Sequence, residues 1–178
     1  PGDTPESRII LFHINDMHAN IDNFAKIAWY VDQEKKNNPQ AHVFFLNAGD
    51  NFSGNPVADQ YQPKGEPIFQ LLNRMGFSAL ELGNHEFDYG QDRLREFIVG
   101  AKFPILCANV DLRGKDPQFP QPRPFTVLET PEGIKIAVLG LIQVEKSTGI
   151  PDTHPSRLEG FRFFDPLETA KKYRYLKK

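Results

Sequence analysis

The sequence predicts an α/β fold built around a mostly parallel sheet. Three apolar runs of strand length, at 9–12, 42–46 and 77–82, each end in a cluster of polar residues. Segments with apolar residues at helical spacing separate them. This alternation is typical of parallel strands joined by right-handed crossovers, and it favours a doubly wound arrangement. The 178 residues, 39% hydrophobic and 25% charged, suffice for one domain with a sizeable core.

An amphipathic helix is expected after the first strand. It ends in the polar run 33–38 before Pro39. Its apolar face consists of Ile21, Phe24, Ile27, Ala28 and Val31. A long loop at 51–65 follows the second strand, and a loop of this length in a compact domain is more often functional than idle.

The second half of the chain predicts further helices, a fourth strand and a hairpin. Pro67 opens a helix that Gly76 caps, and 94–101 form another before a fourth strand at 104–110. The runs 125–129 and 135–139 flank a turn that contains Gly133, which indicates a hairpin. Surface loops are expected at 111–124 and 148–164, and Pro166 begins a last helix.

Composition excludes several classes of function. The formal charge is only −2 and the basic residues are scattered, so no basic stripe for nucleic-acid binding is expected. Cys107 is the single cysteine, and its apolar surroundings predict a small buried hydrophobe. No apolar run approaches the roughly 20 residues of a membrane span. No signal peptide is recognisable, and residues 1–7 are typical of a flexible start.

Polar residues follow each of the first three predicted strands. Asp16 and His18 come after the first, Asp50 after the second, and Asn84, His85 and Asp88 after the third. The carboxyl ends of parallel strands share one edge of the sheet, where α/β proteins bind their ligands. The sequence therefore predicts one site built from all three loops.

These clusters resemble the motifs of the calcineurin-like metallophosphoesterases: D-x-H at 16–18, G-D-x-x-x-G at 49–54 and G-N-H-E at 83–86. The longer segments 13–18 and 83–90 are similar to the 5'-nucleotidase branch of that superfamily. The resemblance implies a four-layer α/β/β/α sandwich with a mostly parallel first sheet, flanking helices and a late hairpin. It implies that 1–178 are the N-terminal portion of the catalytic domain, whose remainder, with a nucleotide-specificity domain, lies outside this chain.

Asp16, His18, Asp50 and Asn84 are the predicted metal ligands. Asp16 and His18 are two positions apart and can reach one cation, and a carboxylate with an imidazole suits Zn, Mn or Fe. A carboxylate such as that of Asp50 can bridge two ions about 3.5–4 Å apart. Asn84 offers a neutral amide oxygen. Alone, each motif is also compatible with a solvated turn, and the resemblance is what implies two divalent metal ions with Asp50 as the bridge.

His85 and Asp88 are the predicted catalytic pair. The resemblance implies that His85 is not a ligand and instead stabilises the transferring phosphoryl group and the leaving oxygen. Asp88, three residues on, lies within one helical turn and can accept a hydrogen bond from the ring. The alternative is a helix-capping segment with no chemistry. His13, His42 and His154 are expected to be structural.

The implied activity is two-metal hydrolysis of phosphate esters, with 5'-nucleotidase as the leading assignment. Alternatives in the same branch are a 2',3'-cyclic-nucleotide phosphodiesterase, a UDP-sugar hydrolase and a thiosulfohydrolase. The family's Gly-His-x-His element is missing and only His154 follows His85, so a non-catalytic fragment that needs a partner chain also remains open. The partner implied is a small nucleotide or other phosphate ester, with a further chain or oligomer covering an exposed sheet face. The resemblance also implies a periplasmic or extracellular location.

Overall fold

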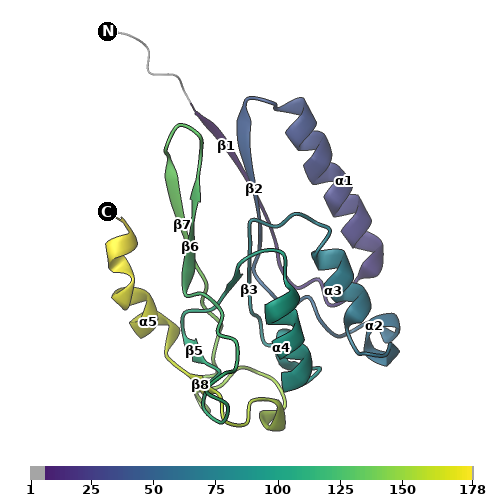
Figure 1. Cartoon of the computed structure of the whole chain (residues 1–178), viewed down its shortest axis with the longest axis vertical. Helices are drawn as coiled ribbons and strands as arrows, with labels where there is room; N and C mark the ends of the chain where they lie inside the picture. The colour runs from purple at the N-terminus through teal and green to yellow at the C-terminus, as the bar shows by residue number, and fades with distance from the viewer. Residues whose placement is uncertain (1–6, 178) are drawn as a thin grey trace.

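A computed structural model describes residues 7–177 of the chain. Its centre is a four-stranded sheet of β1 (Arg8–Ile14), β2 (Ala41–Asn47), β3 (Ala79–Glu81) and β4 (Ile105–Leu106), in the order β1-β2-β3-β4 (Figure 1). Every neighbouring pair is parallel, which confirms the predicted sheet. Of the flexible start expected at 1–7, residues 1–6 lie outside the described part of the chain.

The doubly wound prediction is wrong. Helices α1 (Ile21–Asn37), α3 (Glu66–Leu72) and α4 (Gln91–Gly100) all lie on the same side of the sheet (Figure 1). Each strand pairs with the next one in sequence, so crossovers of one hand place every connecting helix on one face. A doubly wound sheet needs a reversal of strand order, and the alternation of elements in the sequence carries no information on that order.

A hairpin covers part of the opposite face. Strands β6 (Phe125–Glu129) and β7 (Lys135–Leu139) pair in antiparallel register, with the bounds that the sequence predicted. At the hairpin tip Glu132 contacts β2, with its Oε2 2.7 Å from Nε2 of His42. Helix α5 (Pro166–Lys172) follows on the far side of the hairpin (Figure 1). Helix, sheet, hairpin and helix are thus stacked as the predicted layers.

The predicted fourth strand is broken in two. Beyond β4 the chain leaves the sheet, and β5 (Val110–Asp111) pairs antiparallel with β8 (Arg162–Phe163). The fully buried Asn109 lies at the break, where its side-chain amide donates to the carbonyls of Ile142 and Phe164 and its oxygen accepts from the Ile142 amide. These bonds replace the ladder that a continuous strand would need.

Two segments expected to be irregular contain short elements. The loop 51–65 holds α2 (Pro56–Gln60), and Asn55 caps it by accepting from the Val57 amide at 2.9 Å. The segment 148–164 holds the 3₁₀ turn η2 (Pro155–Arg157). The remaining 3₁₀ turns are η1 (His85–Phe87) and η3 (Arg174–Lys177).

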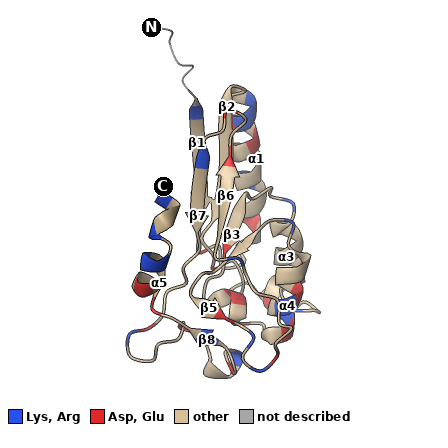
Figure 2. Cartoon of the chain, turned by 60° about the vertical axis from the view of Figure 1, so that its left-hand side comes forward, with Lys and Arg blue, Asp and Glu red and all other residues tan. Residues whose placement is uncertain are grey.

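In Figure 2 Lys and Arg are interspersed with Asp and Glu on α1, α4 and α5. None of the helices within residues 7–177 is both long and apolar enough to cross a bilayer.

The core fills the space between the sheet and its helices, and the other sheet face is only partly covered. Phe45, Leu80 and Phe97 are at most 1% exposed. By contrast Leu11 of β1 is 52% exposed and Val127 of β6 is 44% exposed. A cavity of about 320 Å³ lies between the sheet and the hairpin, lined largely by apolar side chains. Within residues 7–177, β1 and the hairpin thus each leave an apolar side chain exposed.

Candidate active site

The loops that follow β1 and β2 run side by side beyond the sheet. The amides of Asp16 and His18 donate to the carbonyls of Gly49 and Asp50, at 3.1 and 3.0 Å. Asp16, His18 and Asp50 have positive φ angles of 53°, 43° and 57°. Such a conformation in a residue with a side chain costs on the order of 1–3 kcal/mol and is concentrated at functional sites. The hydrogen bonds between the loops hold this backbone in place.

Two glycines allow the second and third loops to approach closely. A Cβ on Gly49 would lie 2.5 Å from the Gly83 amide nitrogen. A Cβ on Gly83 would overlap the carboxylate of Asp50. Asp50 thus occupies the volume that any side chain at position 83 would take, which explains why both motifs contain glycine.

Glu86 joins these two loops through its fully buried carboxylate. Its oxygens accept from the amides of Asp50 at 2.9 Å, Asn51 at 2.8 Å and Gly83 at 2.7 Å. Burial raises the pKa of Glu86, and the hydrogen bonds from Asn51 and Asp50 oppose that rise. Glu86 was assigned no role from the sequence, although its place in G-N-H-E indicated that it serves the site.

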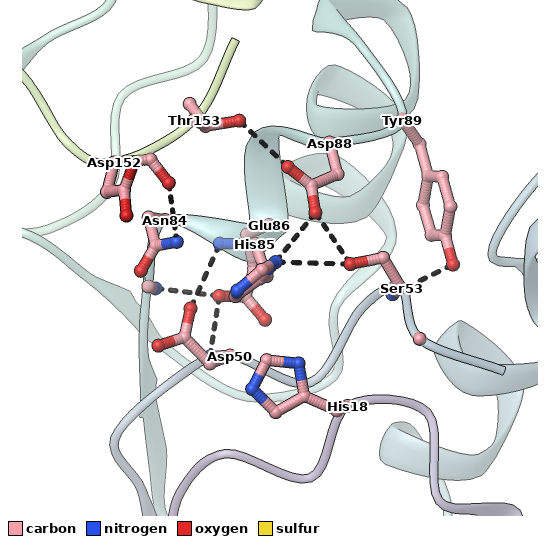
Figure 3. Close-up of polar contacts among 12 residues, drawn as sticks. His18, Asp50, Ser53, Asn84, His85, Glu86, Asp88, Tyr89, Asp152 and Thr153 are labelled. Atoms are coloured by element: carbon pink, nitrogen blue, oxygen red, sulfur yellow. Dashed lines mark hydrogen bonds and ion pairs between the residues drawn. The ribbon is translucent and has the colours of Figure 1, made fainter.

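Asp50 and Asn84 present oxygen atoms to one small pocket. The Asp50 Oδ1 accepts from the His85 amide at 2.9 Å, and the Asn84 Nδ2 donates to the Asp152 carbonyl at 2.8 Å. The amide oxygen of Asn84 therefore remains available, and in Figure 3 it points toward the Asp50 carboxylate. Both residues line a pocket of about 180 Å³ that Glu81 also lines. Burial raises the pKa of Glu81 to about 8.

Asp16 and His18 form a second pair of candidate metal ligands. The His18 Nε2 lies 3.7 Å from Asp16 Oδ1, and the other Asp16 oxygen accepts a hydrogen bond from Asn15. The ring of His18 packs against that of His85, with centroids 4.5 Å apart. His85 thus contacts both pairs, through its ring at His18 and through its backbone amide at Asp50.

His85 and Asp88 are hydrogen bonded, with 2.7 Å between Nδ1 and Oδ2. Burial lowers the pKa of His85, but the hydrogen bond and charge of Asp88 outweigh burial, so the pKa lies above its ordinary value. Burial raises the pKa of Asp88, and hydrogen bonds from Ser53, His85 and Thr153 outweigh it, so that pKa lies below its ordinary value. Both shifts favour the charged forms of the pair.

The remaining histidines have other contacts. His42 pairs with Glu132, and Nδ1 of His154 accepts from the Ser156 amide at the start of η2. His13 is exposed on β1 beside the cavity under the hairpin. The segment before His154 was not assigned to the site from the sequence, yet Asp152 contacts Asn84 and Thr153 contacts Asp88.

The four candidate ligands have chemical groups that bind divalent cations, and they are arranged as two pairs. Within residues 7–177 no group of three His, Cys, Asp or Glu side chains is placed to hold a metal ion. Carboxylate, imidazole and amide oxygen are nevertheless donors that Zn or Mn accepts, and the missing side chain of Gly83 is what admits the Asp50 carboxylate. The predicted ligand set of Asp16, His18, Asp50 and Asn84 stays a prediction.

Comparisons with known proteins find similar sequences among the phosphoesterases. The calcineurin-like phosphoesterase family model matches residues 10–177. The chain is 32% identical over 160 residues to a 5'-nucleotidase of Diplobatis ommata, covering 79% of this chain and 27% of that protein. It is 33% identical over 144 residues to a 2',3'-cyclic-nucleotide 2'-phosphodiesterase/3'-nucleotidase of Salmonella typhimurium, covering 72% of this chain and 21% of that protein.

A solved structure is similar over almost the whole chain. The 5'-nucleotidase precursor of Thermus thermophilus superimposes with a TM-score of 0.75 at 28% identity, covering 93% of this chain and 34% of that one. The chain spans between 21% and 34% of the length of these three relatives. By the family match over residues 10–177 and by the motif loops gathered at one edge of its parallel sheet, the chain belongs to the calcineurin-like phosphoesterase family.

Proposed function

We propose that this protein contributes to metal-dependent hydrolysis of phosphate esters and that its substrate is a nucleoside monophosphate, as for a 5'-nucleotidase. The observation that carries the proposal is the hydrogen-bonded pair of His85 and Asp88, in which His85 contacts both His18 and Asp50. The similarity to proteins named 5'-nucleotidase supports the choice of substrate.

Asp16, His18, Asp50 and Asn84 would hold two divalent ions, Zn, Mn or similar. Such ions, when bound, supply a water of lowered pKa and neutralise charge on phosphate oxygens. Asn84 is oriented for this role because its amide nitrogen is engaged by the Asp152 carbonyl. Glu86 holds the backbone from which Asp50 projects.

His85 would stabilise charge on the phosphoryl group and deliver a proton to the leaving oxygen. Its Nδ1 is engaged by Asp88, so Nε2 is the atom that faces substrate. A pKa above the ordinary value keeps more of the ring protonated near neutral pH, which suits an acid. Asp88 orients the ring and stabilises its positive charge.

We propose further that residues 1–178 act as the N-terminal portion of a catalytic domain. The chain spans at most 34% of the length of the three relatives. Within residues 7–177 the candidate ligands form two pairs, and no three His, Cys, Asp or Glu side chains are placed together to hold a metal ion. Additional ligands would come from more polypeptide, in the same chain or in a partner, that also covers the exposed face of β1. Thiol labelling of Leu11→Cys in the complete gene product tests this: protection is expected, and rapid labelling would contradict it.

A second candidate is hydrolysis of 2',3'-cyclic nucleotides, which the name of the Salmonella typhimurium relative favours. UDP-sugar hydrolase and thiosulfohydrolase activities would use the same motifs, and an inert fragment is the remaining alternative. Chromatography of the products that the metal-loaded gene product forms separates these activities: adenosine and phosphate from AMP, an adenosine monophosphate from 2',3'-cyclic AMP, and UMP with glucose 1-phosphate from UDP-glucose. Hydrolysis of AMP above the others is expected, and no hydrolysis of any of them would refute the proposal.

A periplasmic or extracellular location is part of the same proposal and rests on the resemblance to the 5'-nucleotidase branch. Fractionation of cells that express the complete gene product tests it. Activity toward nucleotides added to intact cells is expected, and activity that appears only after lysis would contradict an exported enzyme.

A further inference from the structure

Asp88 is contacted by side chains from two distant segments as well as by His85. Ser53, 35 residues earlier, donates from Oγ to Oδ2 at 2.6 Å. Thr153, 65 residues later, donates from Oγ1 to Oδ1 at 2.8 Å. Figure 3 shows the carboxylate between these two hydroxyls, with the ring of His85 beside it. Each oxygen of Asp88 therefore has a hydroxyl donor from outside its own turn.

The hydrogen bonds around Asp88 determine which ring nitrogen of His85 is protonated in the neutral ring. Ser53 has one hydroxyl proton, and at 2.6 Å it is donated to Asp88. The Ser53 oxygen, 3.2 Å from Nδ1 of His85, can then only accept. The ionised Asp88 also only accepts, so Nδ1 faces two acceptors and must be protonated. In the neutral ring Nε2 is consequently the free acceptor.

Ser53 is held in place independently of Asp88. Its amide donates to the hydroxyl of Tyr89 at 2.9 Å, and that hydroxyl donates to Asp59 at 2.6 Å. Ser53 has a φ of 59°, which is uncommon for a residue with a side chain. The Tyr89 hydrogen bond stabilises the backbone conformation that aims the serine at the carboxylate.

Thr153 is also anchored by contacts of its own segment. The preceding residue accepts from Asn84 through its carbonyl, and Gln91 donates to the carbonyls of Arg157 and Glu159 at 3.2 and 3.0 Å. Residues 152–159 are thereby fixed to η1 and α4. The threonine hydroxyl thus reaches Asp88 from a rigid support.

We propose that Ser53 and Thr153 are positioning residues that act on His85 through Asp88. By occupying both carboxylate oxygens they hold Asp88 in the orientation that keeps the proton on Nδ1 and leaves Nε2 directed at substrate. When both hydroxyls are removed, the Asp88 carboxylate can rotate, and the neutral ring of His85 becomes a mixture of two tautomers. This inference rests on the proposed function for its catalytic consequence, whereas the tautomer itself does not depend on activity.

The first experiment is nitrogen NMR of the complete gene product labelled with ¹⁵N-histidine, with His85→Gln used to assign the signal. In the neutral ring the expected state is the tautomer protonated at Nδ1, and Ser53→Ala combined with Thr153→Val should give a mixture. A ring protonated at Nε2 in the unsubstituted protein would overturn the inference. So would an unchanged tautomer in the double variant.

The second experiment separates the hydroxyl from the local fold by kinetics. Thr153→Val keeps the shape and loses the donor, so kcat should fall about tenfold, as for one hydrogen bond to a charged group, with KM little changed. Thr153→Ser restores the donor and should recover most of kcat. Ser156→Ala is the control, because Ser156 lies in the same segment and its side chain is hydrogen bonded to His154. Equal losses in the Val and Ser variants would refute the role.

The two proposals can fail separately. If the unsubstituted protein hydrolyses no phosphate ester, the proposed function fails, and the NMR measurement still decides whether Ser53 and Thr153 fix the tautomer. If hydrolysis is observed but the tautomer is mixed in the unsubstituted protein, the inference fails and the proposed function stands.

Discussion

The backbone amide of Asp50 donates to the fully buried carboxylate of Glu86, with 2.9 Å between the nitrogen and Oε2. The same oxygen accepts from the amide of Gly83. A single buried side chain thus fixes the spacing of the two loops that follow β2 and β3. Asp50 and Asn84 lie on these two loops, which makes Glu86 a test of how the site is built.

Glu86→Gln should destabilise the fold. Both carboxylate oxygens accept from amides, so the NH₂ group of glutamine would face a donor and leave it unsatisfied. We expect a loss of about 2–4 kcal/mol in the free energy of unfolding, measured by urea denaturation. Glu132→Gln at the exposed hairpin tip is the matched control and should change little. Equal effects in both variants would contradict the role assigned to Glu86.

Gly83→Ala should destabilise through steric overlap alone. Its Cβ would lie 2.6 Å from both Cγ and the backbone nitrogen of Asp50, which cannot both move away. The expected cost is about 1–3 kcal/mol, together with displacement of the Asp50 carboxylate. Gly133→Ala is the comparison, because its Cβ meets nothing within 4 Å and its only penalty comes from a φ of 86°. A smaller loss at position 83 than at 133 would show that the second loop can move.

Asp111 should make the stability of the fold around the β5–β8 pair depend on pH. Hydrogen bonds from Arg113 and Arg162 lower the pKa of Asp111 to about 2. A carboxyl group with a depressed folded pKa stabilises above its unfolded pKa of about 3.9 and loses that contribution as pH falls through the folded value. The difference in unfolding free energy between the unsubstituted protein and Asp111→Asn should therefore be constant near neutral pH. It should shrink below about pH 4, and a difference independent of pH would contradict this assignment.

His85→Ala should slow turnover strongly without loss of metal. In the complete gene product loaded with Mn²⁺ we expect kcat to fall by about 10²–10⁴, the usual range for removal of an acid. Metal content, measured by elemental analysis after dialysis, should stay unchanged. His42→Ala, far from the site in its pair with Glu132, should retain activity. Loss of metal from His85→Ala would show that this ring is a ligand.

Asp50→Asn, unlike His85→Ala, should lower metal content as well as turnover. It keeps the shape and the hydrogen bond from the His85 amide, but it removes the negative charge offered to a cation. We expect metal content to fall together with turnover, while the unfolding transition of the metal-free protein moves little. Full metal retention would remove Asp50 from the proposed ligand set.

Local sequence patterns were enough to place the late hairpin. The hairpin at 125–129 and 135–139 has the predicted bounds, because alternating apolar residues and a turn glycine act over a few neighbouring positions. The break at Asn109 was not foreseen, because it depends on Ile142 and Phe164, 33 and 55 residues away. The doubly wound arrangement was wrongly predicted for a similar reason, since the order of strands in a sheet is decided by packing between distant segments.

The motifs alone determined which loops meet and which residue types they bring: carboxylates, imidazoles and an amide at the ends of three parallel strands. Only the tertiary structure decided how those groups are held. Glu86, Ser53 and Thr153 act through hydrogen bonds across 35 or more residues, and nothing in the local spacing of a buried carboxylate or a loop hydroxyl shows which distant donor or acceptor will reach it. Backbone periodicity is a property of neighbours in sequence, whereas satisfying a buried polar group is a property of neighbours in space.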